Sequence, residues 1–161
     1  MHVQLKLVLD CPPDAAWAAI RSPEVFRDVA YPLVEFEPLG VTPFPERWDE
    51  AEFEVVAHAL YGIFPLGTQR IALNFRTTGA VRIFEDSGGA TAGPLAVVTR
   101  WRHRMAVAPA AGGGTLLRDR VDFSAGAATP LVWVGVWLFW QWRAARLRRF
   151  APGFARRFST D

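Results

Sequence analysis

The chain has 161 residues, which suits a single domain spanning residues 1–161 with one sizeable core. Its 51% hydrophobic content excludes a disordered chain, and its formal net charge of only +2 argues against nucleic acid as a partner. The single Cys11 excludes an internal disulfide, and the three separated histidines do not indicate a metal site. The N-terminus lacks the basic start and apolar run of a signal peptide, so a cytoplasmic location is expected.

The first part of the chain is predicted to be one strand followed by two short helices. Residues His2 to Asp10 alternate between apolar and polar side chains, as in a half-buried strand. Prolines then break the strand, and Ala15 to Ile20 is expected to form the first short helix. The second begins at Ser22-Pro23-Glu24, where serine caps, proline takes the first helical position and glutamate lies in the first turn.

The middle of the chain is predicted to be a series of strands separated by turns rich in glycine and proline. Alternating side chains indicate strands at Val34–Glu37, Glu52–Leu60, Gln69–Arg76, Val81–Glu85, Ala96–Val107 and Thr115–Ser124. The stretch Asp86 to Pro94 is expected to be a turn, and Ala110 to Gly114 a hairpin loop that joins the last two strands.

The chain ends in its clearest helix, which is expected to be capped by Thr129 and to lose its regularity at Pro152. One apolar stripe follows the helical repeat through Trp133, Trp137, Trp140, Ala144 and Leu147. The run Leu131 to Trp140 is apolar throughout, but spanning a bilayer needs about 20 apolar residues. We therefore interpret this run as a buried core helix, with attachment to a membrane surface as the lesser alternative.

This order of elements predicts an α+β fold. A curved antiparallel sheet of six to seven strands would wrap around the long C-terminal helix, with two short helices after the first strand. The C-terminal helix is the one element long enough to cover a whole sheet face, so sheet and helix are expected to hold the core between them.

Several short motifs carry a resemblance to a known family. They are Pro13-Asp14-Ala15-Ala16-Trp17 after the first strand, Ser22-Pro23-Glu24, Trp101-Arg102-His103-Arg104, Thr115-Leu116-Leu117-Arg118-Asp119-Arg120-Val121, and the closing helix. With them the chain resembles the START-like superfamily, also called SRPBCC or helix-grip proteins, over nearly its whole length. The resemblance implies a ligand cavity between sheet and helix, as in lipid carriers, hormone receptors and the polyketide cyclase/dehydratase group. It does not settle chemistry, because one scaffold hosts many functions.

The strand up to Val107 is the most informative one. Its apolar face, expected to point inward, carries Thr99, Trp101, His103 and Met105, and the opposite face carries Arg100, Arg102 and Arg104. We interpret the arginine row as a solvated face rather than as a stripe for anions. In the next strand the inward face carries Leu117, Asp119, Val121 and Phe123.

His103 and Asp119 are therefore predicted to meet. If the hairpin turn is centred on Ala111, the two residues lie directly opposite each other, and a register slip of two keeps them as diagonal neighbours within reach. The pair is either structural, holding the two strands, or functional, orienting the imidazole as a general base or as a ligand contact.

The function favoured by the sequence is binding of an apolar or aromatic small molecule, lipid-like or polyketide-like, without catalysis. The predicted ligand-binding side chains are Thr99, Trp101, His103, Met105, Asp119, Val121, Phe123, Trp133, Trp137 and Trp140. One alternative is a cyclase/dehydratase-type enzyme with His103 and Asp119 as catalytic acid and base. A further alternative is a module that binds a partner or a membrane surface through the C-terminal helix. For the apolar side chains around this helix, a homodimer or contacts within the chain are favoured over a membrane. Neither a cofactor nor a metal is expected.

Overall fold

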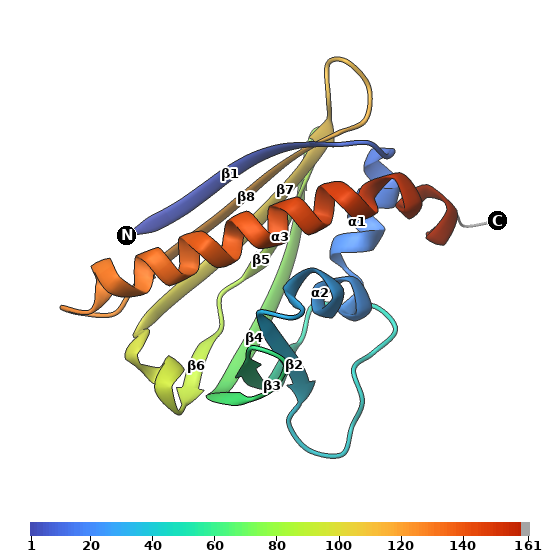
Figure 1. Cartoon of the computed structure of the whole chain (residues 1–161). Helices are drawn as coiled ribbons and strands as arrows, with labels where there is room; N and C mark the ends of the chain where they lie inside the picture. Colours follow the sequence, from blue (N-terminus) through green and yellow to red (C-terminus); the bar gives the residue numbers. More distant parts are fainter. Residues whose placement is uncertain (159–161) are drawn as a thin grey trace.

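The computed structural model describes residues 1–158 and has the predicted α+β architecture (Figure 1). A long C-terminal helix, α3 (Thr129–Arg157), lies along the concave side of a curved antiparallel sheet. The other elements are β1 (His2–Leu9), α1 (Pro13–Ile20), α2 (Pro23–Ala30), β2 (Val34–Pro38), β3 (Glu52–Ala59), β4 (Phe64–Thr78), β5 (Val81–Asp86), β6 (Gly89–Ala92), η1 (Pro94–Val97), β7 (Arg100–Pro109) and β8 (Thr115–Ser124). The fold class expected from the order of elements is confirmed.

The sheet has eight strands in the order β1-β8-β7-β5-β4-β3-β2, with β6 paired to β4 at its side. The additional strand is β6, which lies in the stretch expected to be a turn and pairs antiparallel with β4. The two strands approach so closely that a Cβ on Gly67 would lie 2.0 Å from the carbonyl oxygen of Ala92. Glycine at position 67 permits both this approach and the backbone φ of 114° found there.

The sequence correctly predicts where α2 begins but not where β7 begins. Ser22 caps α2 as predicted, because its Oγ accepts a hydrogen bond of 3.3 Å from the backbone N–H of Val25. β7 begins at Arg100 rather than at Ala96, because Pro94–Val97 forms a 3-10 turn instead of extended chain.

Both ends of α3 differ from the sequence-based expectation. Thr129 does not cap the helix, because its hydroxyl donates to the carbonyl oxygen of Gly126 and thereby holds the preceding turn. The helix also continues through Pro152, although proline removes one backbone hydrogen bond. Ala151 and Phe154 on either side of it are buried in the core, so tertiary packing outweighs the local penalty.

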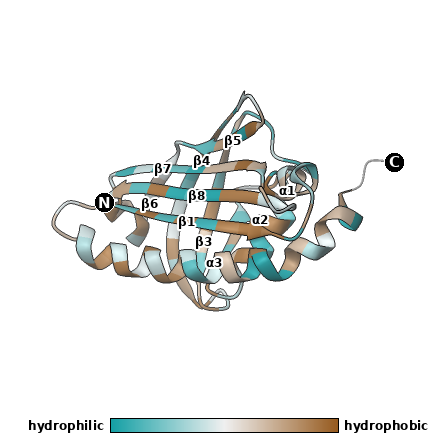
Figure 2. Cartoon of the chain, turned by 90° about the horizontal axis from the view of Figure 1, so that it is seen from above, coloured by the Kyte–Doolittle hydropathy of each residue, from teal (hydrophilic) through white to brown (hydrophobic). Residues whose placement is uncertain are grey.

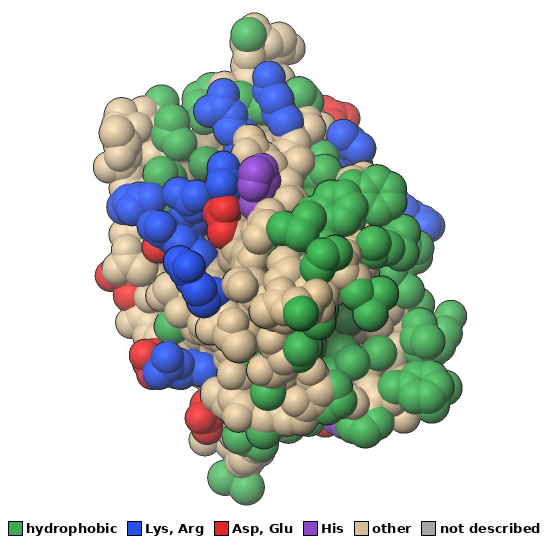
Figure 3. Space-filling model, turned by 90° about the vertical axis from the view of Figure 1, so that its left-hand side faces the viewer, with side chains coloured by type: hydrophobic (Ala, Val, Ile, Leu, Met, Phe, Trp, Pro, Cys, Tyr) green, Lys and Arg blue, Asp and Glu red, His purple; other side chains and the backbone are tan. Residues whose placement is uncertain are grey.

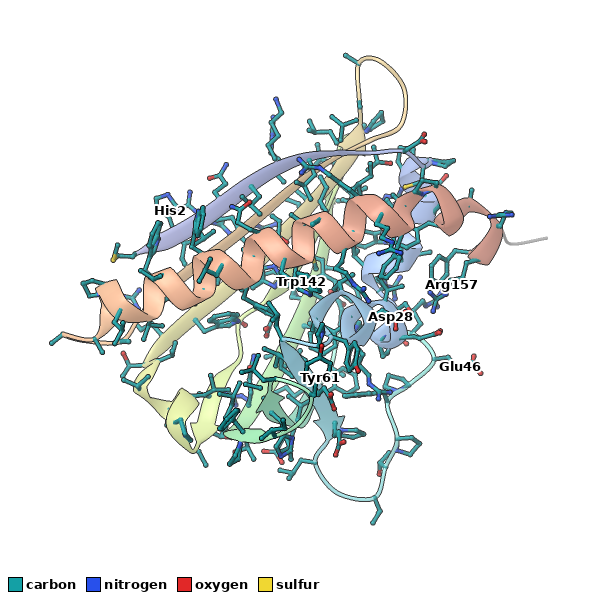
Figure 4. All side chains as sticks on the ribbon, viewed as in Figure 1. His2, Asp28, Glu46, Tyr61, Trp142 and Arg157 are labelled. Carbon is teal, nitrogen blue, oxygen red and sulfur yellow. The ribbon has the colours of Figure 1, made fainter. Side chains whose placement is uncertain are left out.

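The second half of α3 is fastened to α2 and to the segment that follows it (Figure 4). The Nε1 of Trp142 donates to the carbonyl oxygen of Tyr31 at 3.1 Å. Arg157 forms ion pairs with Asp28, at 3.6 Å, and with Glu24. These contacts hold α2 against α3, so the apolar face of α2 is turned toward the interior.

The first half of α3 is only partly buried, which corrects the expectation of a core helix. Leu131 is 78% exposed and Leu138 is 55% exposed, whereas Val132 and Val136 turn inward. The sheet lies against one side of the helix, so the other side meets solvent, and hydrophobic residues recur along its exposed length (Figure 2). Within residues 1–158, no helix is long and apolar enough to cross a lipid bilayer.

The arginine row of β7 is a charge-paired outer face. Arg102 forms an ion pair with Glu85 at 3.0 Å, and Arg104 forms one with Asp122 at 3.4 Å. A hydrogen bond from Arg120 and the charges of Arg120 and Arg104 lower the pKa of Asp122 to about 2. On the face shown in Figure 3, most basic and acidic side chains lie in the left half of the view and most hydrophobic side chains in the right half. Arg102 and Arg104 are thus paired within the sheet and Arg100 is exposed, in agreement with a solvated face.

Candidate ligand-binding cavity

A cavity of about 240 Å³ lies between the sheet, α2 and α3. Large apolar side chains form most of its wall, among them Phe26, Phe36, Trp48, Phe84, Met105 and Phe139. The volume lies just below the roughly 300–1,000 Å³ of common small-molecule sites, which favours a small ligand. Gly135 of α3 both lines the cavity and is exposed, so the cavity opens beside the first half of α3.

The polar side chains of the wall gather around two tryptophan rings. The ring of Trp140 lies 5.1 Å from the ring of His103 and 4.9 Å from the guanidinium carbon of Arg143. The ring of Trp101 lies 5.8 Å from that of Trp140. Trp101 in turn donates its Nε1 to the Asp86 carboxyl at 3.1 Å. All five residues line the cavity, so the wall has one polar end, formed of charged and aromatic side chains; apart from Gln69 of β4, the rest of the wall is apolar.

Asp119 supports this polar end from behind. Its Oδ1 lies 2.7 Å from the Nε2 of His103 and accepts a hydrogen bond of 2.8 Å from the Nε1 of Trp140. The Asp119 side chain does not itself line the cavity and is only 2% exposed. The Nδ1 of His103 has no hydrogen-bond partner among residues 1–158. The carboxyl therefore orients the imidazole and leaves the other ring nitrogen available.

The register of the β7–β8 hairpin is shifted by two residues from the one that would put His103 directly opposite Asp119. His103 pairs with Val121, and Met105 pairs with Asp119, because the turn is centred on Gly112 rather than on Ala111. His103 and Asp119 are consequently diagonal neighbours on the same face of the sheet. A diagonal separation of roughly 7–8 Å between backbones is still bridged by their side chains, so the predicted meeting is confirmed in its diagonal form.

The charges at the polar end shift two pKa values. Burial alone would raise the pKa of the Asp119 carboxyl, but the charges of His103 and Arg143 and the hydrogen bonds from His103 and Trp140 outweigh it. The pKa of Asp119 is therefore held below its usual range. Burial lowers the pKa of Arg143, and the nearby Asp119 charge opposes this shift. The Asp119 carboxylate thus compensates the positive charge of Arg143, which lines the cavity.

Comparison with known proteins identifies the family. Residues 7–151 match the family described as Domain of unknown function (DUF8410). The chain belongs to this family. No curated protein sequence matches the chain.

Solved structures similar to this DUF8410 chain share its helix-grip fold. Protein CV1439 from Chromobacterium violaceum has a TM-score of 0.67 and 14% identity, covering 94% of this chain and 96% of its own. The Zhui aromatase/cyclase from a Streptomyces species has a TM-score of 0.59 and 14% identity, with coverages of 98% and 94%. A norcoclaurine synthase mutant from Thalictrum flavum, in complex with a transition-state analogue, has a TM-score of 0.61 and 12% identity, with coverages of 99% and 96%. At these identities the similarity shows the fold alone.

The predicted ligand-binding residues of the sheet divide into two groups. Trp101, His103 and Met105 line the cavity of the DUF8410 chain, as does Trp140 of α3. By contrast, Val121 and Phe123 are buried in a second apolar cluster, and Thr99 is exposed. Val121 and Phe123 do not line the cavity, because the strands near β1 pack directly on α3. Thr99 does not line it either, because it precedes the start of β7 at Arg100.

Two predicted tryptophans of α3 also lie outside the cavity wall. The rings of Trp133 and Trp137 stack with 6.4 Å between centroids, and Trp133 donates its Nε1 to the carbonyl oxygen of His2 in β1. The stripe is therefore divided: its first two tryptophans lie outside the cavity, whereas Trp140 and Leu147 line it. The other cavity-lining side chains of α3 belong to the neighbouring face and are Val132, Val136, Phe139 and Arg143.

Sequence reasoning missed Asp86 and Arg143. Asp86 has the same alternation as Phe84, which places both on the inner face of β5, but it falls in the stretch expected to be a turn. Its Oδ1 accepts the backbone N–H groups of Ala72 and Gly88, both at 2.9 Å. Arg143 lies three residues after Trp140, and this helical spacing is a signal that could have found it.

Proposed function

We propose that this chain, as a START-like domain, binds a small apolar molecule, lipid-like or polyketide-like, in the cavity between the sheet and α3. The observation that carries the proposal is the cavity itself: an apolar wall with one polar end. Protein interiors contain few voids larger than a water molecule, so a space of about 240 Å³ among large aromatic side chains calls for an occupant. A few polar groups in such a wall orient a ligand without requiring its chemical change.

Titration with the neutral hydrophobic fluorophore N-phenyl-1-naphthylamine tests the proposal. Gly135 lines the cavity, and a Cβ added there meets no atom within 4 Å. The substitution Gly135→Phe therefore places a ring in the cavity opening with no clash at Cβ. Wild-type protein should bind the probe, and Gly135→Phe should bind it at least about tenfold more weakly, which corresponds to about 1.4 kcal/mol.

The matched control is Gly153→Phe, a second glycine of α3 with no atom within 4 Å of an added Cβ and no part in the cavity wall. It should bind the probe like the wild type. Equal binding by all three proteins, each with a cooperative unfolding transition, contradicts binding in this cavity. Native mass spectrometry of the purified protein, followed by extraction, would then identify any small molecule that it retains.

A cyclase/dehydratase-type enzyme is the second candidate, favoured by the His103–Asp119 pair. The imidazole lines the cavity, its Nε2 is held by a buried carboxyl, and its Nδ1 has no partner among residues 1–158. Such a ring suits removal of a proton from carbon next to a ligand carbonyl. Deuterium uptake from D₂O into a bound methyl ketone tests this: wild type should accelerate it, and His103→Gln should not. Equal exchange rates in both proteins leave only the binding function.

A further inference from the structure

We infer that Arg143 holds an uncharged oxygen acceptor of the bound ligand, such as a ketone carbonyl, at the polar end of the cavity. The inference rests on the proposed binding function and specifies its ligand. Arg143 lies one helical turn after Trp140, on the face of α3 that lines the cavity, and is only 7% exposed. It is thus a buried cation that faces the space left for a ligand.

The hydrogen-bonding capacity of Arg143 is unused. A guanidinium carries five N–H donors. Its nearest carboxyl oxygen is the Oδ2 of Asp119, 3.9 Å from its Nη1 and beyond hydrogen-bond distance. Its other contacts are with the rings of Trp140 and Phe139, at 4.9 and 6.0 Å from the centroids. None of residues 1–158 accepts a hydrogen bond from this side chain. Its nitrogens are not among the fully buried unpaired atoms, so they are accessible and can donate to a ligand atom in the cavity that Arg143 lines.

The charge of Arg143, by contrast, already has counterparts. The carboxylate of Asp119 faces it from β8, and a second carboxyl, that of Asp86, lines the same cavity from β5. His103 lies between them on β7 as the one other basic group of the wall. A ligand carboxylate would add a negative charge at a site where the two acidic groups already equal or outnumber the positively charged ones. Because the cavity has a low dielectric constant, this excess charge would be costly. An uncharged oxygen supplies the missing acceptor without that penalty.

These observations point to a class of ligand rather than to a single compound. The apolar wall receives a hydrocarbon or aromatic body, and Arg143 receives the carbonyl at one end. The ligand class is thus a compact apolar molecule with one uncharged oxygen acceptor, for which a ketone is the test case, distinct both from a plain hydrocarbon and from a carboxylic acid.

Three probes of nearly the same shape separate these chemistries. They are 2-acetylnaphthalene, the hydrocarbon 2-isopropenylnaphthalene and the anion 2-naphthoate, each measured by displacement of N-phenyl-1-naphthylamine. A hydrogen bond to a charged group contributes about 1.5–3 kcal/mol, so wild type should prefer the ketone to the hydrocarbon by about 10- to 100-fold. The ketone should also bind more tightly than 2-naphthoate.

The substitution Arg143→Met keeps an unbranched, flexible side chain that matches the aliphatic part of arginine and removes the guanidinium with its donors. The ketone-to-hydrocarbon preference, a ratio of two affinities measured in the same protein, should fall at least about tenfold, toward equality. The control is Arg149→Met, which removes the same charge from an exposed position of the same helix and should keep the wild-type preference. An unchanged preference in Arg143→Met, or tighter binding of 2-naphthoate than of the ketone by wild type, overturns the inference.

A measurement on wild type alone covers the case in which Arg143→Met does not fold. The infrared carbonyl stretch of bound, ¹³C-labelled 2-acetylnaphthalene should move to lower frequency than in hexane, because the guanidinium donates to the oxygen. A stretch at its hexane position overturns the role of Arg143 while the binding function stands. If wild type binds neither the fluorophore nor any of the three probes, the proposed function fails, and the inference fails with it.

Discussion

Replacing Asp119 with asparagine removes the negative charge beneath the polar end of the cavity while keeping the side-chain shape. In the structure the Asp119 carboxyl contacts the Nε2 of His103 at 2.7 Å and the Nε1 of Trp140 at 2.8 Å. It is also the nearest counter-ion of the buried Arg143. Asp119→Asn therefore weakens two hydrogen bonds and leaves a buried cation without its counter-ion.

The expected loss follows from these contacts. Removing one partner of a buried ion pair costs about 3–5 kcal/mol, because the other charge stays buried and uncompensated. The contact between Asp119 and Arg143 is long, at 3.9 Å, which places its share at the low end of that range. Asparagine keeps one acceptor oxygen for His103 or Trp140, so part of the hydrogen bonding survives. The free energy of unfolding should fall by about 3 kcal/mol.

Urea unfolding followed by far-UV circular dichroism and tryptophan fluorescence measures this loss. The control is Asp122→Asn on the same strand, whose partially exposed carboxyl faces the outer arginine row and should cost at most about 1 kcal/mol. The double variant Asp119→Asn/Arg143→Met should be less destabilised than the sum of the single variants by at least about 1 kcal/mol, because the uncompensated cation is gone.

Two results would refute the reasoning. A loss below about 1 kcal/mol for Asp119→Asn, similar to that of Asp122→Asn, would show that the buried carboxyl carries no special charge interaction. Strict additivity in the double variant would show that Asp119 does not compensate Arg143, and the charge balance used above would then be wrong.

Three further predictions concern pH, backbone and surface. The pKa of Asp122 in the folded protein, about 2, lies below its unfolded value, so the ionised carboxylate stabilises the fold. This contribution to the free energy of unfolding should be complete above about pH 4 and lost toward pH 2. In Asp122→Asn, the acid unfolding transition should lack the contribution of this carboxylate. Gly67→Ala should lower the free energy of unfolding by about 1–3 kcal/mol, because the backbone φ is positive there and the new Cβ clashes with Ala92. The control is Gly112→Ala, where the new Cβ has open space around it; its thermal denaturation should match that of the wild type. Leu138→Gln, on the exposed side of α3, should change the stability of the monomer by less than about 0.5 kcal/mol. If a second copy of the chain covers this side, the substitution should abolish concentration-dependent sedimentation. A wild-type protein that sediments as a monomer at all concentrations rules out this dimer.

The strands and their faces were predictable from local pattern. The alternation in β7 puts Trp101 and His103 on the inner face, and the structure agrees, because side chains of any strand point to opposite sides in turn. The same rule placed Asp119 inside. The sequence also predicted the order of elements, and with it the fold class, because only one helix is long enough to cover the sheet.

The sequence could not place the helical face that lines the cavity. Trp133 and Trp137 belong to the apolar stripe of α3 but do not line the cavity, whereas Val136 and Arg143 outside the stripe do. Trp133 is instead bonded to β1. Periodicity says which residues share a face, but the rotation of a helix about its axis depends on what packs against it. That rotation is set by β1 and α2, which are remote in sequence from α3.

By itself the sequence determined what is local: alternation along strands, the Ser22 cap and the shared inner face of His103 and Asp119. Three features depend on the tertiary structure: the hairpin register, the rotation of α3 about its axis, and the position of Arg143 against the cavity without a hydrogen-bond acceptor. The physical reason is that burial and charge compensation depend on groups brought together across the whole chain. No window of neighbouring residues contains Asp86, Asp119 and Arg143 together, so their common site arises only when the sheet curves around the helix.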